Sequence, residues 1–232
     1  MVVINYFRIK VTGVLMKDTE YYYLMEELSR LINKAIGRSK VLREIHKVNT
    51  FKNYCFDGLS PVEKEGYKKF KIYSFNIKTI DKVFAQELIK GLKDLQNDLL
   101  MIHRVNSVEE VVKNVDVLYT LTPAIAVMEK GKHWQESDYS LEDLRGRINS
   151  NIQRKYKSWY EEEVDVDHDM IEDIELLNER PIIFKYKEGV LITNKFRLTI
   201  KKDDLSQKLG KFMYAVGALE KNSLGMGYIV RC

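Results

Sequence analysis

Residues 1–13 read MVVINYFRIKVTG and begin the pattern that decides the fold. Their Val, Ile, Tyr and Phe side chains favour a β-strand over residues 2–12. Apolar side chains then recur at helical spacing over residues 24–35, and Gly37 is placed to end that helix. Strands at 50–56 and 69–78, a helix over 84–95 and a strand at 99–105 follow. The order strand, helix, strand, strand, helix, strand is that of the ferredoxin-like unit.

The second half of the chain repeats this order. Residues 115–129 read as extended, with Pro123 indicating an edge or a bend, and a long helix is expected over 141–159. The remaining expected elements are strands at 181–187 and 190–201 around the turn Glu188-Gly189, a helix over 205–213, and a C-terminal strand. The sequence therefore predicts an α+β protein with two tandem ferredoxin-like domains, 1–112 and 113–232, whose boundary lies within 106–115.

Composition narrows the class of protein. The chain has 232 residues, of which 45% are hydrophobic and 31% charged, with 12 Gly and 3 Pro, so a disordered or collagen-like chain is excluded. No apolar run approaches the roughly 18–20 residues of a membrane span, and residues 1–13 lack a signal-peptide profile. Two cysteines, Cys55 and Cys232, are too few for a disulfide framework. We expect a cytoplasmic protein without a membrane partner.

Charge is unevenly distributed along the chain. The formal net charge is +4, yet residues 160–179 hold ten acids and no Lys or Arg. The other residues therefore carry 38 basic against 24 acidic side chains, a net of +14. A surplus of this size favours binding of a polyanion, although it also serves solubility.

The stretch GALEKNSLGMGY at 217–228 is the most informative motif. It contains a polar turn and two glycines: Lys221, Asn222, Ser223, Gly225 and Gly227. No Gly-Lys-Ser/Thr follows at the spacing of a Walker A loop, and no room remains for a dinucleotide-binding unit. Glycines let a backbone lie close to a phosphate chain, where N–H groups and a lysine supply donors. The alternative is a tight hairpin that needs positive φ.

Three segments carry a resemblance to a known family. Residues 217–227 resemble the glycine-rich signature of the CRISPR-associated endoribonucleases that process precursor CRISPR RNA, the Cas-six family. The stretch LYTLTPAIAVMEKG at 118–131 is similar to the start of that family's second domain, and the helix over 144–156, which ends NIQRKY, is similar to the helix found there. The resemblance implies the same paired ferredoxin-like architecture.

His46 and Lys52 are the candidate catalytic residues. Histidine transfers protons near neutral pH, and lysine can stabilise charge that develops on a phosphate. On their own, the two residues would equally fit a surface histidine near a lysine. The resemblance implies catalysis, because the family typically places a His in this region with a supporting Lys. Some members add a Tyr where this chain has Asn33, which cannot act as a general acid, so His46 is expected to carry more of the proton transfer.

A metal site is not expected. His168 lies within Asp165-Val-Asp-His-Asp, but alternation along a strand would place the aspartates and the histidine on opposite faces. No histidine pair occurs at i, i+4, and neither cysteine has a nearby second ligand, so a solvated acidic loop is favoured. Elsewhere, Lys130 and Lys132 could contact RNA beside Trp134, whose ring fits either stacking or the core.

The resemblance implies a metal-independent endoribonuclease, without a cofactor, that cuts CRISPR repeat RNA and leaves 2′,3′-cyclic phosphate and 5′-OH ends. The basic residues expected to hold the RNA backbone are Lys221, Lys130, Lys132, Arg145, Arg147, Arg154 and Lys155. Effector-complex subunits or a second copy of the chain are further expected partners. Two alternatives stay open: a non-catalytic RNA-binding subunit of a CRISPR ribonucleoprotein, and a metal nuclease that uses the acids of 161–175.

Overall fold

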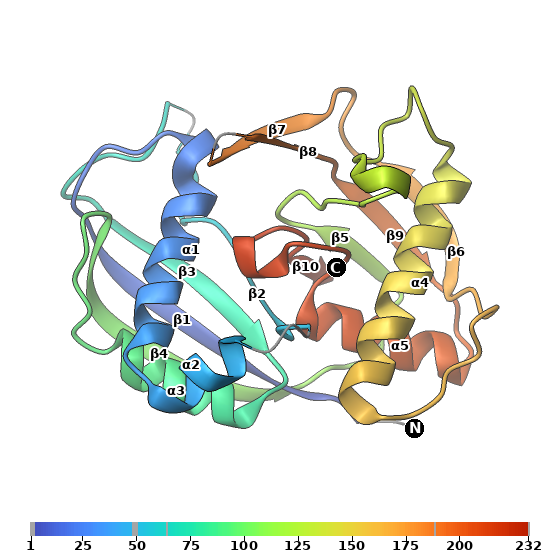
Figure 1. Ribbon diagram of the computed structural model, residues 1–232, viewed down its shortest axis with the longest axis horizontal. Coiled ribbons are helices and arrows are strands. Elements are labelled where there is room, and N and C mark those ends of the chain that lie inside the picture. Colours follow the sequence, from blue (N-terminus) through green and yellow to red (C-terminus); the bar gives the residue numbers. More distant parts are fainter. Residues whose placement is uncertain (1–2, 48–50, 64, 188, 232) are drawn as a thin grey trace.

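The computed structural model describes residues 3–47, 51–63, 65–187 and 189–231, and contains two four-stranded antiparallel sheets packed against helices (Figure 1). The first half comprises β1 (Asn5–Leu15), α1 (Tyr21–Gly37), α2 (Lys40–Lys47), β2 (Tyr54–Phe56), β3 (Ile72–Thr79), α3 (Lys82–Leu92) and β4 (Leu100–Val111). Its strand order, β2-β3-β1-β4, is that of a ferredoxin-like sheet with α1 and α3 as the two crossover helices.

The second half comprises β5 (Val117–Thr120), the 3-10 turn η1 (Glu129–Gly131), α4 (Leu141–Tyr160), β6 (Ile171–Leu176), β7 (Ile182–Tyr186), β8 (Gly189–Thr193), β9 (Phe196–Ile200), α5 (Asp204–Val216), the 3-10 turn η2 (Asn222–Leu224) and β10 (Ile229–Arg231). Its main sheet has the order β10-β5-β9-β6, the same topology as the first. The β7–β8 hairpin is an insertion between the second and third strands. The prediction of two tandem ferredoxin-like units is therefore confirmed.

Local sequence explains where the helices begin and which face they bury. Asp81 precedes α3 and accepts a hydrogen bond from the Phe84 N–H at 2.9 Å. Ser140 and Asp143 form a reciprocal capping box at the start of α4. In α1 the apolar stripe predicted from the sequence is fully buried, at Leu24, Leu28, Leu31, Ile32 and Ala35.

Three element boundaries differ from the sequence prediction. The expected strand over 190–201 is two strands, β8 and β9, which belong to different sheets. The expected extended stretch 115–129 holds only the short β5 before an irregular segment. The predicted acidic loop around His168 lies outside any helix or strand, but no strand was expected directly after it, where residues 171–176 form β6 and pair with β9 at one edge of the second sheet. The assignment of the two domains to 1–112 and 113–232 stays a prediction.

The two halves share their cores. Ile4 and Tyr6, from the N-terminal end, are buried in the second hydrophobic cluster, whereas Ile125, Phe184 and Met226 are buried in the first. Phe184 of the β7–β8 hairpin contacts the Tyr21 ring at the start of α1, with a centroid distance of 5.3 Å. Figure 1 shows this hairpin reaching across the top of the molecule from β9 to α1. In the described part of the chain, no helix has the length and apolar character to cross a membrane.

Candidate functional site

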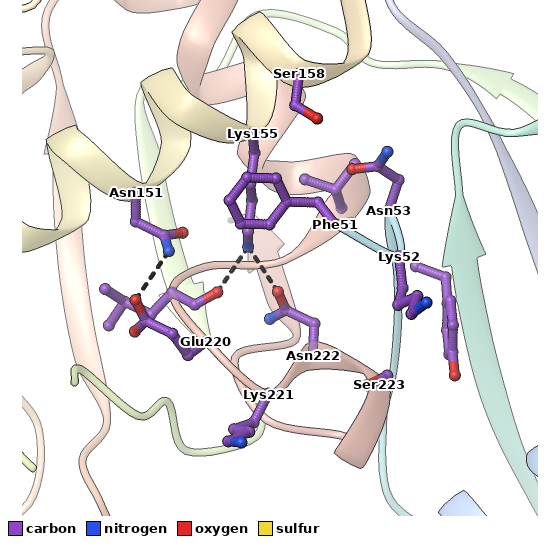
Figure 2. A pocket seen from close by; sticks show the side chains of 13 residues that line it. Phe51, Lys52, Asn53, Asn151, Lys155, Ser158, Glu220, Lys221, Asn222 and Ser223 are labelled. Atoms are coloured by element: carbon purple, nitrogen blue, oxygen red, sulfur yellow. Dashed lines mark hydrogen bonds between the residues drawn. The ribbon is translucent and has the colours of Figure 1, made fainter. Parts of the chain in front are cut away.

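A cavity of about 590 Å³ lies where the segment before β2, the second half of α4 and the glycine-rich stretch meet (Figure 2). Its lining is Phe51, Lys52, Asn53, Tyr54, Asn151, Lys155, Ser158, Val216, Leu219, Glu220, Lys221, Asn222 and Ser223. Three lysines and one carboxylate are among these described residues, so the lining carries a net positive charge. Both halves of the chain therefore build one cavity.

The glycine-rich stretch is a tight turn held by its own hydrogen bonds. Gly225 and Gly227 have φ of +80° and +69°. A Cβ at Gly225 would lie 2.5 Å from Met25 and 2.6 Å from Phe56, and one at Gly227 would lie 2.1 Å from the Ala218 carbonyl oxygen. Both glycines are thus required by packing within the protein, as the hairpin alternative proposed. Approach of RNA to them stays a prediction.

Several backbone N–H groups of this turn already donate to carbonyl oxygens of the same chain. The Leu224 N–H donates to Lys221 O at 2.9 Å, the Gly225 N–H to Asn222 O at 2.9 Å and the Gly227 N–H to Pro123 O at 2.9 Å. The expectation that such N–H groups contact a phosphate is therefore corrected for these three. The Lys221 side chain, which is exposed, is the donor that the turn presents outward.

Lys155 on α4 fastens the turn to the second domain. Its side chain is 4% exposed, and its Nζ donates to Gly217 O at 3.0 Å, Leu219 O at 2.7 Å and Asn222 Oδ1 at 2.6 Å. An ammonium has three N–H donors, so all of them are satisfied. Burial lowers the pKa of Lys155 to about 7. Lys155 therefore lines the floor of the cavity, where its main role is to hold the glycine-rich turn in place.

The first domain holds the turn from the other side. Ser29, buried on α1, donates its hydroxyl to Ser223 O at 3.1 Å. Met25 of α1 and Phe56 of β2 occupy the space beside Gly225. Since neither domain alone supplies both sets of contacts, the turn is ordered at the junction of the two.

Glu220 organises a second polar group at the cavity. Its Oε1 accepts from Asn151 Nδ2 at 3.0 Å and forms an ion pair with Arg147, and its Oε2 accepts from the Val127 N–H at 3.2 Å. Arg147, predicted to bind RNA, is therefore engaged by a carboxylate of the same chain. In Figure 2, Asn151 and Glu220 lie on the opposite side of the pocket from Lys52.

Lys52 and His46 differ in how far the structure describes them. Lys52 lines the cavity and is partly buried, and this burial lowers the pKa of its ammonium. The backbone of His46 belongs to the last turn of α2, but its side chain lies outside the described residues. Asn33 is exposed on α1, and no residue of α1 belongs to the described cavity lining.

The other residues predicted to bind RNA do not gather at the cavity. Lys130, Lys132 and Arg154 are exposed. Arg145 forms an ion pair with Asp169. Burial alone would raise the pKa of Asp169, but hydrogen bonds from Arg145, the Ile171 N–H and Asn149 lower it to about 2. Part of the acidic stretch is therefore structural.

The histidines described elsewhere have ordinary packing roles. His168 lies 2.9 Å from the Ser206 hydroxyl, and His133 Nδ1 accepts the Ile192 N–H at 3.1 Å. Trp134 is buried and donates its indole N–H to Ser140 O at 2.9 Å, so it belongs to the core and does not stack on RNA. Within the described ranges, no three His, Cys, Asp or Glu side chains gather as metal ligands would.

The sequence prediction missed Phe51, Asn53, Asn151 and Glu220. A signal was present for two of them. Asn151 stands four residues before Lys155, which places both on one helix face, and Asn53 directly follows Lys52. Glu220 gives no such signal, because a single acidic residue beside a lysine in a polar turn is most simply interpreted as a solvent-exposed side chain.

Known structures share the whole fold. A solved CRISPR associated protein Cas6 superposes with a TM-score of 0.71 at 20% identity, covering 98% of this chain and 99% of that one. A Cas6-related protein from Pyrococcus furiosus gives 0.68 at 18% identity, covering 98% of each chain. A RAMP protein described as binding different RNA substrates gives 0.73 at 16% identity, covering 97% of this chain and 99% of that one. The chain thus shares its paired ferredoxin-like fold with these solved proteins.

The sequence identifies the family. Residues 105–230, more than half of the chain, match the family model for CRISPR associated protein Cas6, C-terminal. The chain therefore belongs to the Cas6 family, and the resemblance in its glycine-rich stretch is confirmed. No protein of curated function matches the sequence.

Proposed function

We propose that this protein is a metal-independent endoribonuclease that binds CRISPR repeat RNA and cuts within it to release guide RNAs. The observation that carries the proposal is the cavity at the junction of the two domains, which joins Lys52 to the glycine-rich turn of a Cas6-family chain. A CRISPR effector complex or a second copy of the chain would be a further partner.

The chemistry needs only groups that the RNA and the protein supply. The ribose 2′-oxygen attacks the adjacent phosphorus while the bond from phosphorus to the 5′-oxygen breaks. The 2′-hydroxyl gives up its proton to a base, and the departing 5′-oxygen takes one from an acid, which leaves 2′,3′-cyclic phosphate and 5′-OH ends. The protein must align these atoms and move the protons.

His46 is the proposed acid or base, and Lys52 the proposed stabiliser of the charge on phosphorus. Lys52 lies at the cavity, and a partly buried ammonium interacts more strongly with a phosphate than a fully solvated one does. His46 is six residues away along the chain, at the end of α2. Lys221, exposed on the turn that lines the cavity, and Arg154, exposed on α4 outside the cavity lining, would contact the RNA backbone.

The test is single-turnover cleavage of the repeat RNA from the protein's own CRISPR array, in EDTA and in magnesium. We expect similar rates in both, a cyclic phosphate on the upstream fragment, and a loss of about 10²–10⁴-fold in His46→Ala. His103→Ala, an exposed histidine on β4, is the matched control and should change the rate less than about threefold.

Two outcomes contradict the proposal in different ways. A 3′-OH on the upstream fragment with an absolute need for magnesium would support the metal-nuclease alternative. Tight binding without cleavage would support the non-catalytic RNA-binding subunit, an alternative favoured by the absence of an ionisable side chain at Asn33.

A further inference from the structure

Two amide oxygens of the cavity lining have no hydrogen-bond partner. Asn151 is 1% exposed, and its Oδ1 is buried and unpaired; the Oδ1 of Asn53 is likewise buried and unpaired. Figure 2 shows both oxygens directed toward the middle of the pocket. A buried acceptor without a donor is costly, and buried polar groups are ordinarily paired. These oxygens therefore indicate that a ligand supplies N–H groups here.

The orientation of the Asn151 amide is fixed by its neighbour. Its Nδ2 lies 3.0 Å from Glu220 Oε1, and a carboxylate paired with Arg147 can only accept. The nitrogen must therefore face Glu220, and the atom left for a ligand is the oxygen. The ligand group that meets Asn151 is accordingly a donor.

A phosphate does not fit this side of the cavity. Phosphate oxygens are acceptors, and they would meet the acceptor oxygens of Asn151 and Glu220. The nearby Lys155 offers no compensation, because its three donors are taken by Gly217 O, Leu219 O and Asn222 Oδ1. Lys52, on the opposite side of the pocket, remains the place for the phosphate.

A flat ring with amino donors does fit. Phe51 lines the cavity with a ring that is 36% exposed, and Val216 and Leu219 add apolar surface. Unpaired bases stack on such aromatic rings. The volume of about 590 Å³ lies within the roughly 300–1,000 Å³ typical of sites that bury a small molecule.

We propose that the cavity holds one unpaired base of the RNA, next to the phosphate that is cut, and selects a base with an exocyclic amino group. Adenine, cytosine or guanine donates from that amino group to Asn151 Oδ1 while its ring stacks on Phe51. Uracil has no amino group. Its N3–H donor lies between two carbonyl oxygens, which would meet the acceptor oxygens of Asn151 and Glu220, so uracil is disfavoured. This assignment rests on the proposed function, since it takes RNA as the substrate.

The test replaces, one at a time, each nucleotide that flanks the cut by uridine or an abasic residue. Wild type should lose about 10- to 100-fold in single-turnover rate at one position. Asn151→Ala should be slower on the unmodified RNA and should show less than threefold further loss from uridine at that position, whereas the abasic residue should still cost the stacking on Phe51. Gln153→Ala removes another buried amide of α4, one that bonds Asp165 O and His168 O away from the cavity, and should keep the full positional preference.

A second measurement does not depend on the folding of Asn151→Ala. An RNA with a 2′-deoxy residue at the cut and 2-aminopurine at the sensitive position should lose fluorescence on binding to wild type. Phe51→Leu, at a partly exposed position, should bind with less of this quenching. Two results would overturn the base pocket and leave the endoribonuclease proposal intact. One is cleavage at the same rate with every replacement; the other is a loss of rate from the uridine replacement that is as large in Asn151→Ala as in wild type. Failure of wild type to bind the RNA would overturn both.

Discussion

Lys78 and Lys155 are two buried lysines that hold the same C-terminal segment from opposite domains. Lys78, on β3 of the first domain, is 1% exposed and donates to Tyr214 O at 3.3 Å and Ile229 O at 2.7 Å. Lys155, on α4, donates hydrogen bonds to the glycine-rich turn, which lies between Tyr214 and Ile229 in the chain. Lys78 thus joins the domains, whereas Lys155 shapes the cavity.

Their surroundings differ in a way that matches these roles. The Lys78 ammonium lies 3.5 Å from the centre of the Tyr214 ring and 4.4 Å from that of Tyr228. Cation–π interactions with these two rings therefore stabilise its charge. Among the residues that the structure describes, the hydrogen-bond partners of Lys155 Nζ are two carbonyl oxygens and one amide oxygen. Burial lowers the pKa of Lys78 to about 8 and that of Lys155 to about 7. Both lysines are buried, but aromatic rings surround the Lys78 ammonium, whereas oxygen atoms of the turn surround the Lys155 ammonium.

The largest expected effect comes from Gly227→Ala, which breaks the segment between the two lysines. The new Cβ would lie 2.1 Å from the Ala218 carbonyl oxygen, and φ is +69°. Steric overlap and left-handed strain together should lower the free energy of unfolding by about 3–5 kcal/mol in urea titrations. Gly131→Ala has a similar φ of +74° but open space around it, and should cost about 1 kcal/mol. Equal losses in the two variants would contradict the steric explanation.

Lys155→Met and Lys78→Met should separate the two roles. Each variant leaves backbone carbonyls without a donor, and we expect each to lower the free energy of unfolding by about 2 kcal/mol at pH 7 after the relief of charge burial is included. Only Lys155→Met should slow cleavage of repeat RNA, by about 10- to 100-fold, because the cavity floor moves. Both rates are measured at a temperature where each variant is folded. Equal slowing in both variants would show that the turn depends on domain docking alone.

The smallest expected effect is a difference in pH dependence. A lysine whose folded pKa lies below its unfolded value near 10.5 binds fewer protons in the folded state between those two values, so stability rises with pH there. From pH 7 to 8.5, Lys155 should add about 1–2 kcal/mol and Lys78 about half as much.

In urea titrations at several pH values, each Met variant should lose the part of the rise in the free energy of unfolding with pH that its own lysine contributes. Ionisable neighbours, chiefly Glu220 for Lys155 and Cys55 followed by Asp57 for Lys78, oppose the effect of burial without removing it. The window ends near pH 9, where the Cys55 thiol acts in the opposite sense because burial raises its pKa to about 12. A wild-type slope that persists in both variants would contradict the assignment.

The fold was largely predictable because apolar periodicity marks most of its elements. The stripe of α1 and the Ser140 cap of α4 are local signals. β6 was not predictable, because it is an edge strand that pairs only with β9 and exposes Glu172 and Glu175. The division between β8 and β9 at Asn194-Lys195 carries no Gly or Pro to mark it.

The site was predictable only in part. Lys52, Lys155, Lys221, Asn222 and Ser223 were singled out from the sequence, and the structure brings them to one cavity. The roles of Arg145 and Arg147 were not readable from composition, because their partners Asp169 and Glu220 lie 24 and 73 residues away. A basic residue in a sequence does not show whether a distant carboxylate already neutralises it.

The exchange of terminal residues between the two cores has a consequence for synthesis on the ribosome. Met226, in the glycine-rich stretch of the second half, completes the core of the N-terminal domain, and Gly225 fits against Met25 and Phe56. The first domain is made early, but part of its apolar surface stays uncovered until residues 225 and 226 have also been made and have left the exit tunnel. We therefore expect a product truncated before residue 225 to expose part of the first domain's core and to be less stable than the same residues in the full chain.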